Sequence, residues 1–498
     1  MPTPHARAGT IRHLTLVALC AAIPFLPCLG NDFVNWDDPA YITHNPVLRM
    51  SPIQVIREAF SATFASCYAP LPVVSHAVEY RLWGVHPAGY HAVNILLHVA
   101  AALLVWMLLA RLATPGGALA GALLFAVHPL RVEAVAWASQ RKELLSTVCA
   151  LGAILAYLRA RNSSGMLRRH LPLLLGIAAL LSKPTAVTLP ALMLLVDPDI
   201  ADDPRAAIRR ILPVSAAALA IALLTVATQH EAIRNAPPLP AMLRPGLALR
   251  NSALYLGKTV APVGLSAVYP YPDTRELVWW TLAAAPAAWA LLRAARYRTI
   301  VSQGLLWWCI ALLPTLQIIP AGTSSAADRY TYLPAVGLSL AVAGTIARRR
   351  LRPLVPTVVS AAVVAVLGLL SAERCLVWRD SISLWSDALR RYPTSTTARN
   401  NRASAYLAAQ RIPEALEDLD AGLSREPDNA MMLVNRGIAR SLAGDTDGAL
   451  RDLERAVTLA PGSSTAWHNY SRALERAGRS GEAARARART RNTGRFHE

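Results

Sequence analysis

The sequence predicts an all-α protein in two parts: a polytopic bundle of transmembrane helices over residues 1–370 and a solenoid of helix pairs over residues 371–498. Three observations lead to this prediction. Hydrophobic residues make up 54% of the 498 residues and charged residues only 16%, whereas soluble proteins average about a quarter charged. The apolar residues gather in blocks between residues 14 and 370. The remaining residues are charged, rich in alanine and helical in pattern.

Several apolar blocks approach the ~20 residues that an α-helix needs to cross a membrane. The first follows two arginines but is not followed by a small-residue cleavage site, so we expect an uncleaved helix rather than a signal peptide. Two short arms flank Lys183 and Pro184, which predicts a hairpin or a re-entrant segment. The blocks amount to about eleven spans. They are 14–29, 89–110, 117–129, 143–160, 171–182 with 184–196, 211–228, 277–295, 300–319, 330–347 and 353–370.

The distribution of arginine predicts the orientation of these spans. With the N-terminus in the cytoplasm, the dense, short basic connections all fall on the cytoplasmic side. An odd number of spans then places the C-terminal solenoid outside the cytoplasm. We therefore expect a multi-pass protein of a bacterial inner membrane with the solenoid in the periplasm; in a eukaryote it would face the lumen of the endoplasmic reticulum. The external loops are 30–88, 129–142, 229–276 and 320–329.

The net charge of +19 could suggest a nucleic-acid partner. We expect none, because much of the positive charge lies between apolar blocks, where it sets membrane orientation. The six cysteines show no metal-ligand spacing and are interpreted as packing residues.

The C-terminal part repeats with a period of 34 residues. Pro393, Pro427 and Pro461 follow this spacing, which is typical of tetratricopeptide repeats (TPRs). The repeats are expected at 396–429, 430–463 and 464–491. Such arrays bind peptides or proteins through a concave face, so we expect a protein or peptide partner; the alternative is a rigid spacer or a cap.

Ionisable residues cluster in the external segments. Asp37 and Asp38 lie just after the first span, near Tyr41, and paired carboxylates can act as a general base and as a metal ligand on the phosphate side of a site. The alternative for this pair is an Asp-Pro turn at the membrane surface. Further candidates can bind a cation through a carboxylate or imidazole, or a phosphate through a basic group, or can serve only as interfacial anchors. They are His128, Arg131, Glu133, Arg141, Lys142, Lys183 and Arg329.

Six ordered motifs carry a resemblance to a known family. They read WDDP-x-Y at 36–41, Y-x-PL at 68–71, GYHAVN-x-LLH at 89–98, HPLRVEAVAW-x-S-x-RKELLS at 128–146, LSKP-x-AVTLP at 181–190 and ADRYTYLP at 327–334. With the TPRs, this order resembles the transmembrane-and-TPR-containing glycosyltransferases, which include eukaryotic protein O-mannosyltransferases. The resemblance implies a C-type glycosyltransferase fold and a polyprenyl-phosphate sugar donor used on the external membrane face.

The resemblance also implies roles for the candidate residues. Asp37 matches the catalytic base, with Asp38 as the second candidate, and Tyr41 joins the substrate-binding candidates. Glu133 and His128 become candidates for binding a divalent cation or for shaping the acceptor site. The candidate clamps for the lipid phosphate are Arg131, Arg141, Lys142, Lys183 and Arg329. The array of about three TPRs is shorter than the long eukaryotic arrays.

Two functions remain open from the sequence. In the first, the protein is an inverting glycosyltransferase that moves a mannose-like sugar to an acceptor, expected to be a protein Ser or Thr hydroxyl recruited by the TPRs. In the second, it is a membrane-anchored TPR scaffold for an envelope complex without catalysis. A transporter is disfavoured because few ionisable residues lie in the middle of the spans.

Overall fold

The computed structural model describes residues 4–65, 67–160, 165–228, 233, 236–297, 299–348 and 354–494. Its helices form two compact units, Met1–Arg379 and Asp380–Glu498. Within the described residues the only β-pairing is two isolated bridges, so the all-α class is confirmed. Helix α16 (Leu354–Val377) runs beyond residue 370, so the two units divide later in the chain than the sequence suggests.

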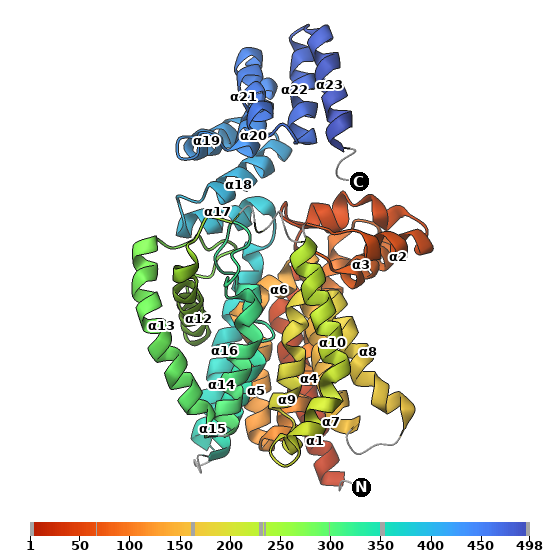
Figure 1. Cartoon of the computed structure of the whole chain (residues 1–498), viewed down its shortest axis with the longest axis vertical. Helices are drawn as coiled ribbons and strands as arrows, with labels where there is room; N and C mark the ends of the chain where they lie inside the picture. Colours follow the sequence, from red (N-terminus) through yellow and green to blue (C-terminus); the bar gives the residue numbers. More distant parts are fainter. Residues whose placement is uncertain are drawn as a thin grey trace. The chain divides into compact units, whose positions relative to one another are not determined.

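The first unit is a bundle of helices joined by short segments, most of them 3-10 turns and one of them, η2, a π-helical turn (Figure 1). The helices are α1 (Pro4–Ala22), α2 (Pro52–Ser61), α3 (Pro70–Trp83), α4 (Pro87–Leu112), α5 (Pro115–Val127), α6 (Val132–Ala136), α7 (Arg141–Ala160), α8 (Met166–Ser182), α9 (Leu189–Leu195), α10 (Pro204–Thr228), α12 (Arg244–Val260), α13 (Thr274–Ala295), α14 (Ile300–Leu312), α15 (Ala335–Arg348) and α16. The turns that matter below are η1 (Ile23–Gly30), η2 (Pro39–Thr43), η4 (Pro129–Arg131), η5 (Ala138–Gln140), η6 (Pro184–Thr188) and η10 (Asp328–Thr331).

Proline sets where several of these helices begin. Helices α2, α3, α4 and α5 start at Pro52, Pro70, Pro87 and Pro115. Proline suits the first helical position because it lacks an N–H that would have no partner there, and its φ is already helical. The same residue ends the preceding segment, so the chain turns sharply between successive helices.

The segment around Lys183 is a hairpin that runs the length of α7. Lys183 pairs with Glu143 near the start of α7, whereas Asp197 accepts a hydrogen bond from Tyr157 near its end. Glu143 and Tyr157 are 14 residues apart in α7, which is about 21 Å along a helix. Their partners, Lys183 and Asp197, are also 14 residues apart. The chain therefore returns along α7 between Lys183 and Asp197.

Small residues bring the helices of the bundle into close contact. A Cβ added at Gly337 in α15 would lie 2.4 Å from the carbonyl oxygen of Gly304 in α14. A Cβ at Gly121 in α5 would lie 2.5 Å from the carbonyl oxygen of Ser339. Close backbone approach through small residues is typical of helix packing in membranes.

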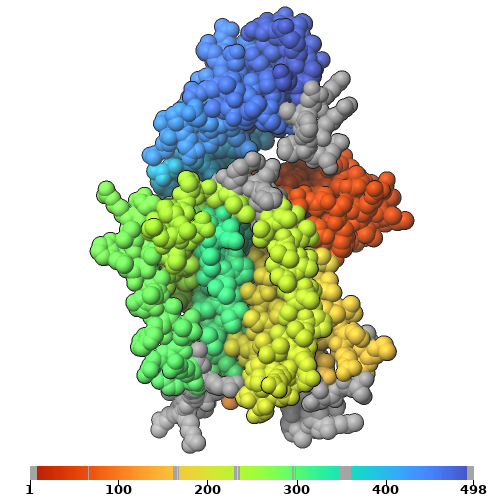
Figure 2. All heavy atoms as spheres, viewed as in Figure 1, coloured from red at the N-terminus to blue at the C-terminus, as the bar shows by residue number. Residues whose placement is uncertain are grey.

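Fewer helices can cross a membrane alone than the sequence predicts. Among the described residues, five are long and apolar enough by length and composition: Ala8–Gly30, Pro87–Leu112, Ala138–Ala160, Pro204–Thr228 and Ser360–Val377. The bent pair Pro115–Val127 and Pro129–Ala136 would make a sixth. Other predicted spans fall on shorter apolar helices at Pro184–Leu195, Ile300–Thr315 and Ala335–Ile346. Figure 2 shows α10 running lengthwise at the surface of the bundle. The count of about eleven thus stays a prediction.

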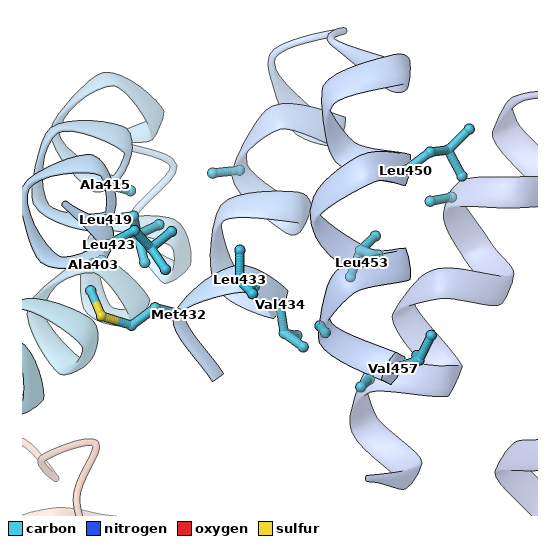
Figure 3. Packing of buried hydrophobic residues seen from close by; sticks show 14 of the residues in the cluster. Ala403, Ala415, Leu419, Leu423, Met432, Leu433, Val434, Leu450, Leu453 and Val457 are labelled. Carbon is cyan, nitrogen blue, oxygen red and sulfur yellow. The ribbon is translucent and has the colours of Figure 1, made fainter. Parts of the chain in front are cut away.

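The second unit is a TPR solenoid. After α17 (Ser381–Arg391) it holds three helix pairs: α18 (Thr396–Ala408) with α19 (Ile412–Leu423), α20 (Ala430–Leu442) with α21 (Thr446–Leu459), and α22 (Ser464–Arg476) with α23 (Ser480–Gly494). The first helix of each pair begins at the first residue of an expected repeat. Small and aliphatic side chains, among them Ala403, Leu419 and Leu453, fill the core between the pairs (Figure 3).

Candidate functional site

The ionisable candidates gather at one end of the first unit. They come from the segment after η1, the turns between α5 and α7, the tip at Lys183, and the turn before α15. Helices α2 and α3 lie at this end, and the start of α1 lies at the other (Figure 1). The ion pairs of their side chains include Lys142–Asp37, Lys183–Glu143 and Arg329–Glu133.

Asp38 ties two loops together. Its carboxylate is buried and accepts the backbone N–H groups of Val34 and Ser139, each at 2.9 Å. Burial raises the pKa of Asp38 to about 6, and the two backbone donors offset part of this rise. Both oxygens are therefore engaged in holding the first external loop against η5.

Asp37 is the more accessible member of the acidic pair. Its side chain is 21% exposed, and Oδ2 accepts a hydrogen bond from Lys142 Nζ at 2.9 Å. The Lys142 ammonium also lies 4.7 Å from the centre of the Tyr41 ring. Tyr41 is buried, which raises the pKa of its phenol, and its hydroxyl donates to the carbonyl of Phe64. Tyr41 thus positions the lysine through its ring.

Arg329 is held by a carboxylate and by aromatic rings. Both its backbone N–H and its Nη1 donate to Glu133. Its guanidinium lies 5.2 to 5.7 Å from the ring centres of Trp137 and Trp36, which stack on each other at 4.6 Å. Burial alone would lower the pKa of Arg329, but the Glu133 charge outweighs it and raises the pKa.

Lys183 reaches the same cluster from the hairpin tip. Its ammonium pairs with Glu143 and lies 5.3 Å from the centre of the Tyr330 ring. Arg329 lies 4.9 Å from that same ring. The Tyr330 ring therefore lies between the Lys183–Glu143 and Arg329–Glu133 pairs, and the charge of Asp37 also acts on Arg329. We call these two pairs and Lys142–Asp37 the ion-pair cluster.

Two of the predicted phosphate clamps are buried among other partners. Arg141 donates to Asn94, Ser75, Glu79 and the carbonyl of Tyr90. It is fully buried. Arg141 therefore joins the start of α7 to α3 and α4, and all its side-chain nitrogens already donate, so it is poorly placed to bind a phosphate.

Arg131 is in a similar position. Its two Nη atoms donate to the carbonyl and hydroxyl oxygens of Thr331, at 2.9 and 2.8 Å. Its guanidinium also lies 5.3 Å from the Tyr332 ring centre and 5.5 Å from that of Phe125. Arg131 therefore joins η4 to the turn before α15.

The two candidate metal ligands do not converge. His128 accepts the N–H of Leu130 at Nδ1 and bonds the carbonyl of Thr259 through Nε2. Both oxygens of Glu133 bind Arg329. Within the described ranges, no group of three His, Cys, Asp or Glu side chains could hold a metal ion. These two residues therefore do not fit a cation site.

Three residues of this region were missed from the sequence. Asp328 is buried and accepts the Tyr269 hydroxyl at 2.6 Å. Its pKa is raised to about 7, first by burial and then by the charge of Glu133. Glu79 and Asn94 hold Arg141. Asn94 lies inside the GYHAVN motif, and Asp328 precedes Arg329, so both had a signal; Glu79 had none.

Comparisons with known proteins agree with both units. The tetratricopeptide repeat family matches residues 378–430, 401–463 and 434–490. Protein O-mannosyl-transferase Tmtc1 of Drosophila melanogaster is 37% identical over 206 residues, which cover 38% of this chain and 24% of that protein. The resemblance expected from the motifs is confirmed.

Other protein O-mannosyl-transferases match in the same way. TMTC4 of Mus musculus is 24% identical over 470 residues, which cover 78% of this chain and 63% of that protein. For the Drosophila relative, the chain spans about a quarter of the length of the curated protein. Among solved structures, ArnT from Cupriavidus metallidurans bound to undecaprenyl phosphate has a TM-score of 0.39 and 14% identity, over 89% of this chain and 79% of that one.

Proposed function

We propose that this chain is a membrane glycosyltransferase that moves a mannose-like sugar from a polyprenyl-phosphate donor to a Ser or Thr hydroxyl of a protein. The proposal rests mainly on the position of Asp37. It is the accessible carboxylate of the acidic pair, it contacts the Lys142 ammonium, and its charge also acts on Arg329. The curated relatives are named protein O-mannosyl-transferases, which supports the reaction class.

In the proposed reaction, Asp37 accepts the proton of the acceptor hydroxyl. The acceptor oxygen forms a bond to the anomeric carbon while the bond from that carbon to the phosphate oxygen breaks, with inversion. The electron pair of the broken bond stays on the phosphate. A phosphate leaving group needs no proton from the protein, so one carboxylate base suffices.

Lys142 and Arg329 are the cations that we assign to the donor phosphate. Each is held by a carboxylate and lies beside at least one aromatic ring, and the side chains of Lys142 and Arg329 are 10% and 14% exposed. When a phosphate binds Lys142, that ammonium shares its charge between phosphate and Asp37, which leaves the carboxylate free to accept a proton. Lys183 is the next candidate, through its position beside Tyr330.

The sidedness and the acceptor are further parts of the proposal. We propose that the ion-pair cluster faces the outside of a bacterial inner membrane, with the TPR unit in the periplasm. A TPR array offers a concave surface for an extended peptide. We assign to it the recruitment of the acceptor protein.

The proposal is tested in membranes supplied with a labelled polyprenyl-phosphate sugar. We expect Asp37→Asn to lower the transfer rate by about 10²- to 10⁴-fold, the range for a lost general base. Asp32→Asn is the matched control, because Asp32 lies in the same loop and its side chain is exposed. It is expected to leave the rate unchanged.

A second arm separates the two members of the acidic pair. We expect Asp38→Asn to lower the amount of folded protein more than the rate per folded molecule, because its carboxylate bonds two loops. Unchanged transfer in the Asp37→Asn, Asp38→Asn double variant would reject the catalytic assignment and favour a membrane-anchored TPR scaffold.

A further inference from the structure

A cavity of about 520 Å³ opens at the end of the bundle opposite the ion-pair cluster. It lies between the last turn of α7 and the first halves of α8 and α10. Tyr157 in its lining is 15 residues after Lys142 along α7, which is roughly 22 Å in a helix. The cavity is therefore separate from the site described above.

The cavity is lined by basic side chains and by an apolar wall. Arg169 and His170 come from α8, and Arg209 and Arg210 come from α10. Its apolar wall is formed by Ala160, Pro172, Leu173, Ala206, Pro213 and Val214. This combination suits a ligand with an anionic group attached to an apolar body.

Arg210 is fixed in place by carboxylates. Its Nη2 donates to Asp197 at 2.8 Å and to Asp199 at 3.2 Å, and Tyr157 donates to the same Asp197. The Nε of Arg210 is buried and has no hydrogen-bond partner within the described structure. Asp197 and Asp199 therefore hold the Arg210 guanidinium through Nη2 in the lining of the cavity.

Arg169 and Arg209 differ from Arg210, because both side chains are exposed at the cavity. They lie where the candidate spans end: the α7 span stops at Ala160 and the α10 span starts at Pro204. Basic pockets between helices at this depth are suited to anionic lipid headgroups.

We propose that this cavity binds the phosphate headgroup of an anionic membrane lipid, with Arg169 and Arg209 as the main phosphate contacts and Arg210 as the anchored third cation. The apolar wall accommodates the glycerol and the first carbons of the acyl chains. A free phosphate shares the charge of such a headgroup but has no apolar body to occupy that wall. The site lies apart from the glycosyl-transfer cluster, and its occupancy does not depend on catalysis.

The test measures lipid binding to the purified full chain in detergent by native mass spectrometry, with phosphatidylglycerol and phosphatidylcholine supplied in equal amounts. We expect the wild-type chain to retain phosphatidylglycerol preferentially. The double variant Arg169→Gln, Arg209→Gln is expected to lose about tenfold or more of this preference, given the contribution of each basic residue near a membrane surface.

The matched control is the double variant Arg168→Gln, Arg205→Gln. It removes the same charge from the same two helices, at exposed positions that do not line the cavity. It is expected to keep the preference. Equal losses in the two double variants would reject the site, because general surface charge would then explain the retention. Competition by inorganic phosphate as strong as by lipid would reject the lipid headgroup as the ligand. Thermal unfolding in phosphatidylcholine confirms that each variant is folded.

Discussion

The two units of this protein both use buried or half-buried ion pairs, but they place them at very different separations along the chain. In the TPR unit, Arg402 binds Asp418 and Arg436 binds Asp452, each over 16 residues. The second pair follows the first by the 34-residue period of the repeat. At the ion-pair cluster of the first unit, Lys183–Glu143 spans 40 residues, Lys142–Asp37 spans 105 and Arg329–Glu133 spans 196.

This difference decides what each ion pair does. An ion pair within one repeat joins two helices that are neighbours along the chain. The same pair therefore recurs in the next repeat of the sequence. A pair between distant loops closes a long segment of chain, and each such closure has an entropic cost. The cluster therefore depends on the whole bundle being folded, whereas the TPR pairs depend on a single helix pair.

The largest expected difference comes from removing one arginine in each unit. Arg141→Met leaves the buried Glu79 with Ser75 and His76 as its remaining partners and without a guanidinium, which costs about 3–5 kcal/mol of stability. Arg402→Met leaves Asp418 with Arg399, which also binds it, so the cost is about 1 kcal/mol. Thermal unfolding of the full chain in detergent, followed by tryptophan fluorescence, measures both. Similar losses would contradict the proposed contrast between the units.

The second effect is a pH dependence at Asp38. Burial raises the pKa of Asp38 from 3.8 to about 6, so the folded state binds the proton more tightly than the unfolded state. The stability that comes from this tighter proton binding is thus present below about pH 4 and is lost as the pH rises through about 6, whereas the two backbone hydrogen bonds to its oxygens are a separate contribution. The change is on the order of 3 kcal/mol.

The check on Asp38 is the stability of the wild type relative to Asp38→Asn across pH 4 to 7. We expect the wild type to lose stability relative to the variant as the pH rises. The exposed Asp32→Asn, in the same loop, serves as the control for the loss of one carboxyl group. A flat difference for Asp38→Asn would show that the pKa of Asp38 is not raised in the folded state.

The smallest effect contrasts two close-packed glycines. In Gly337→Ala the new Cβ meets the backbone oxygen of Gly304, which cannot move alone, so we expect a loss of about 1–3 kcal/mol. In Gly437→Ala it meets Cγ of the buried Leu453 at 2.6 Å, so a side chain rather than a backbone must shift, and the helix gains up to about 1 kcal/mol from alanine. Heat denaturation midpoints of the two variants compare them. A larger loss for Gly437→Ala would show that the TPR core is the less adaptable one.

The sequence predicted the local features well because they depend on neighbouring residues. The helical class, the apolar blocks and the starts of the TPR helices follow from composition, proline positions and a fixed period. It also singled out Asp37, Lys142 and Arg329, because ionisable residues next to apolar blocks stand out. Which charged residues form ion pairs was not predictable, since Glu133 and its partner Arg329 are 196 residues apart in the chain.

The same limit explains the candidates that the structure assigns differently. Arg131 and Arg141 resemble phosphate clamps in sequence, but their partners, Thr331 and Glu79, lie far along the chain. His128 resembles a metal ligand in sequence, but in the structure its Nε2 is bonded to the carbonyl of Thr259. In each case a polar residue had to be buried, and burial requires a partner that only the folded chain supplies.

The end of α16 completes the loop that carries Asp37. Trp378 stacks on Trp137, the carbonyl of Cys375 accepts a bond from the Asn31 amide, and the carbonyl of Arg379 accepts the N–H of Asp32. The Asn31 bond joins residues 344 positions apart. At roughly 5–20 residues per second, a ribosome takes about 17 to 70 s to make that intervening chain. The loop that carries Asp37 is therefore synthesised long before the residues at the end of α16 that contact it. Truncated chains that end before α16 contain this loop but lack those contacts.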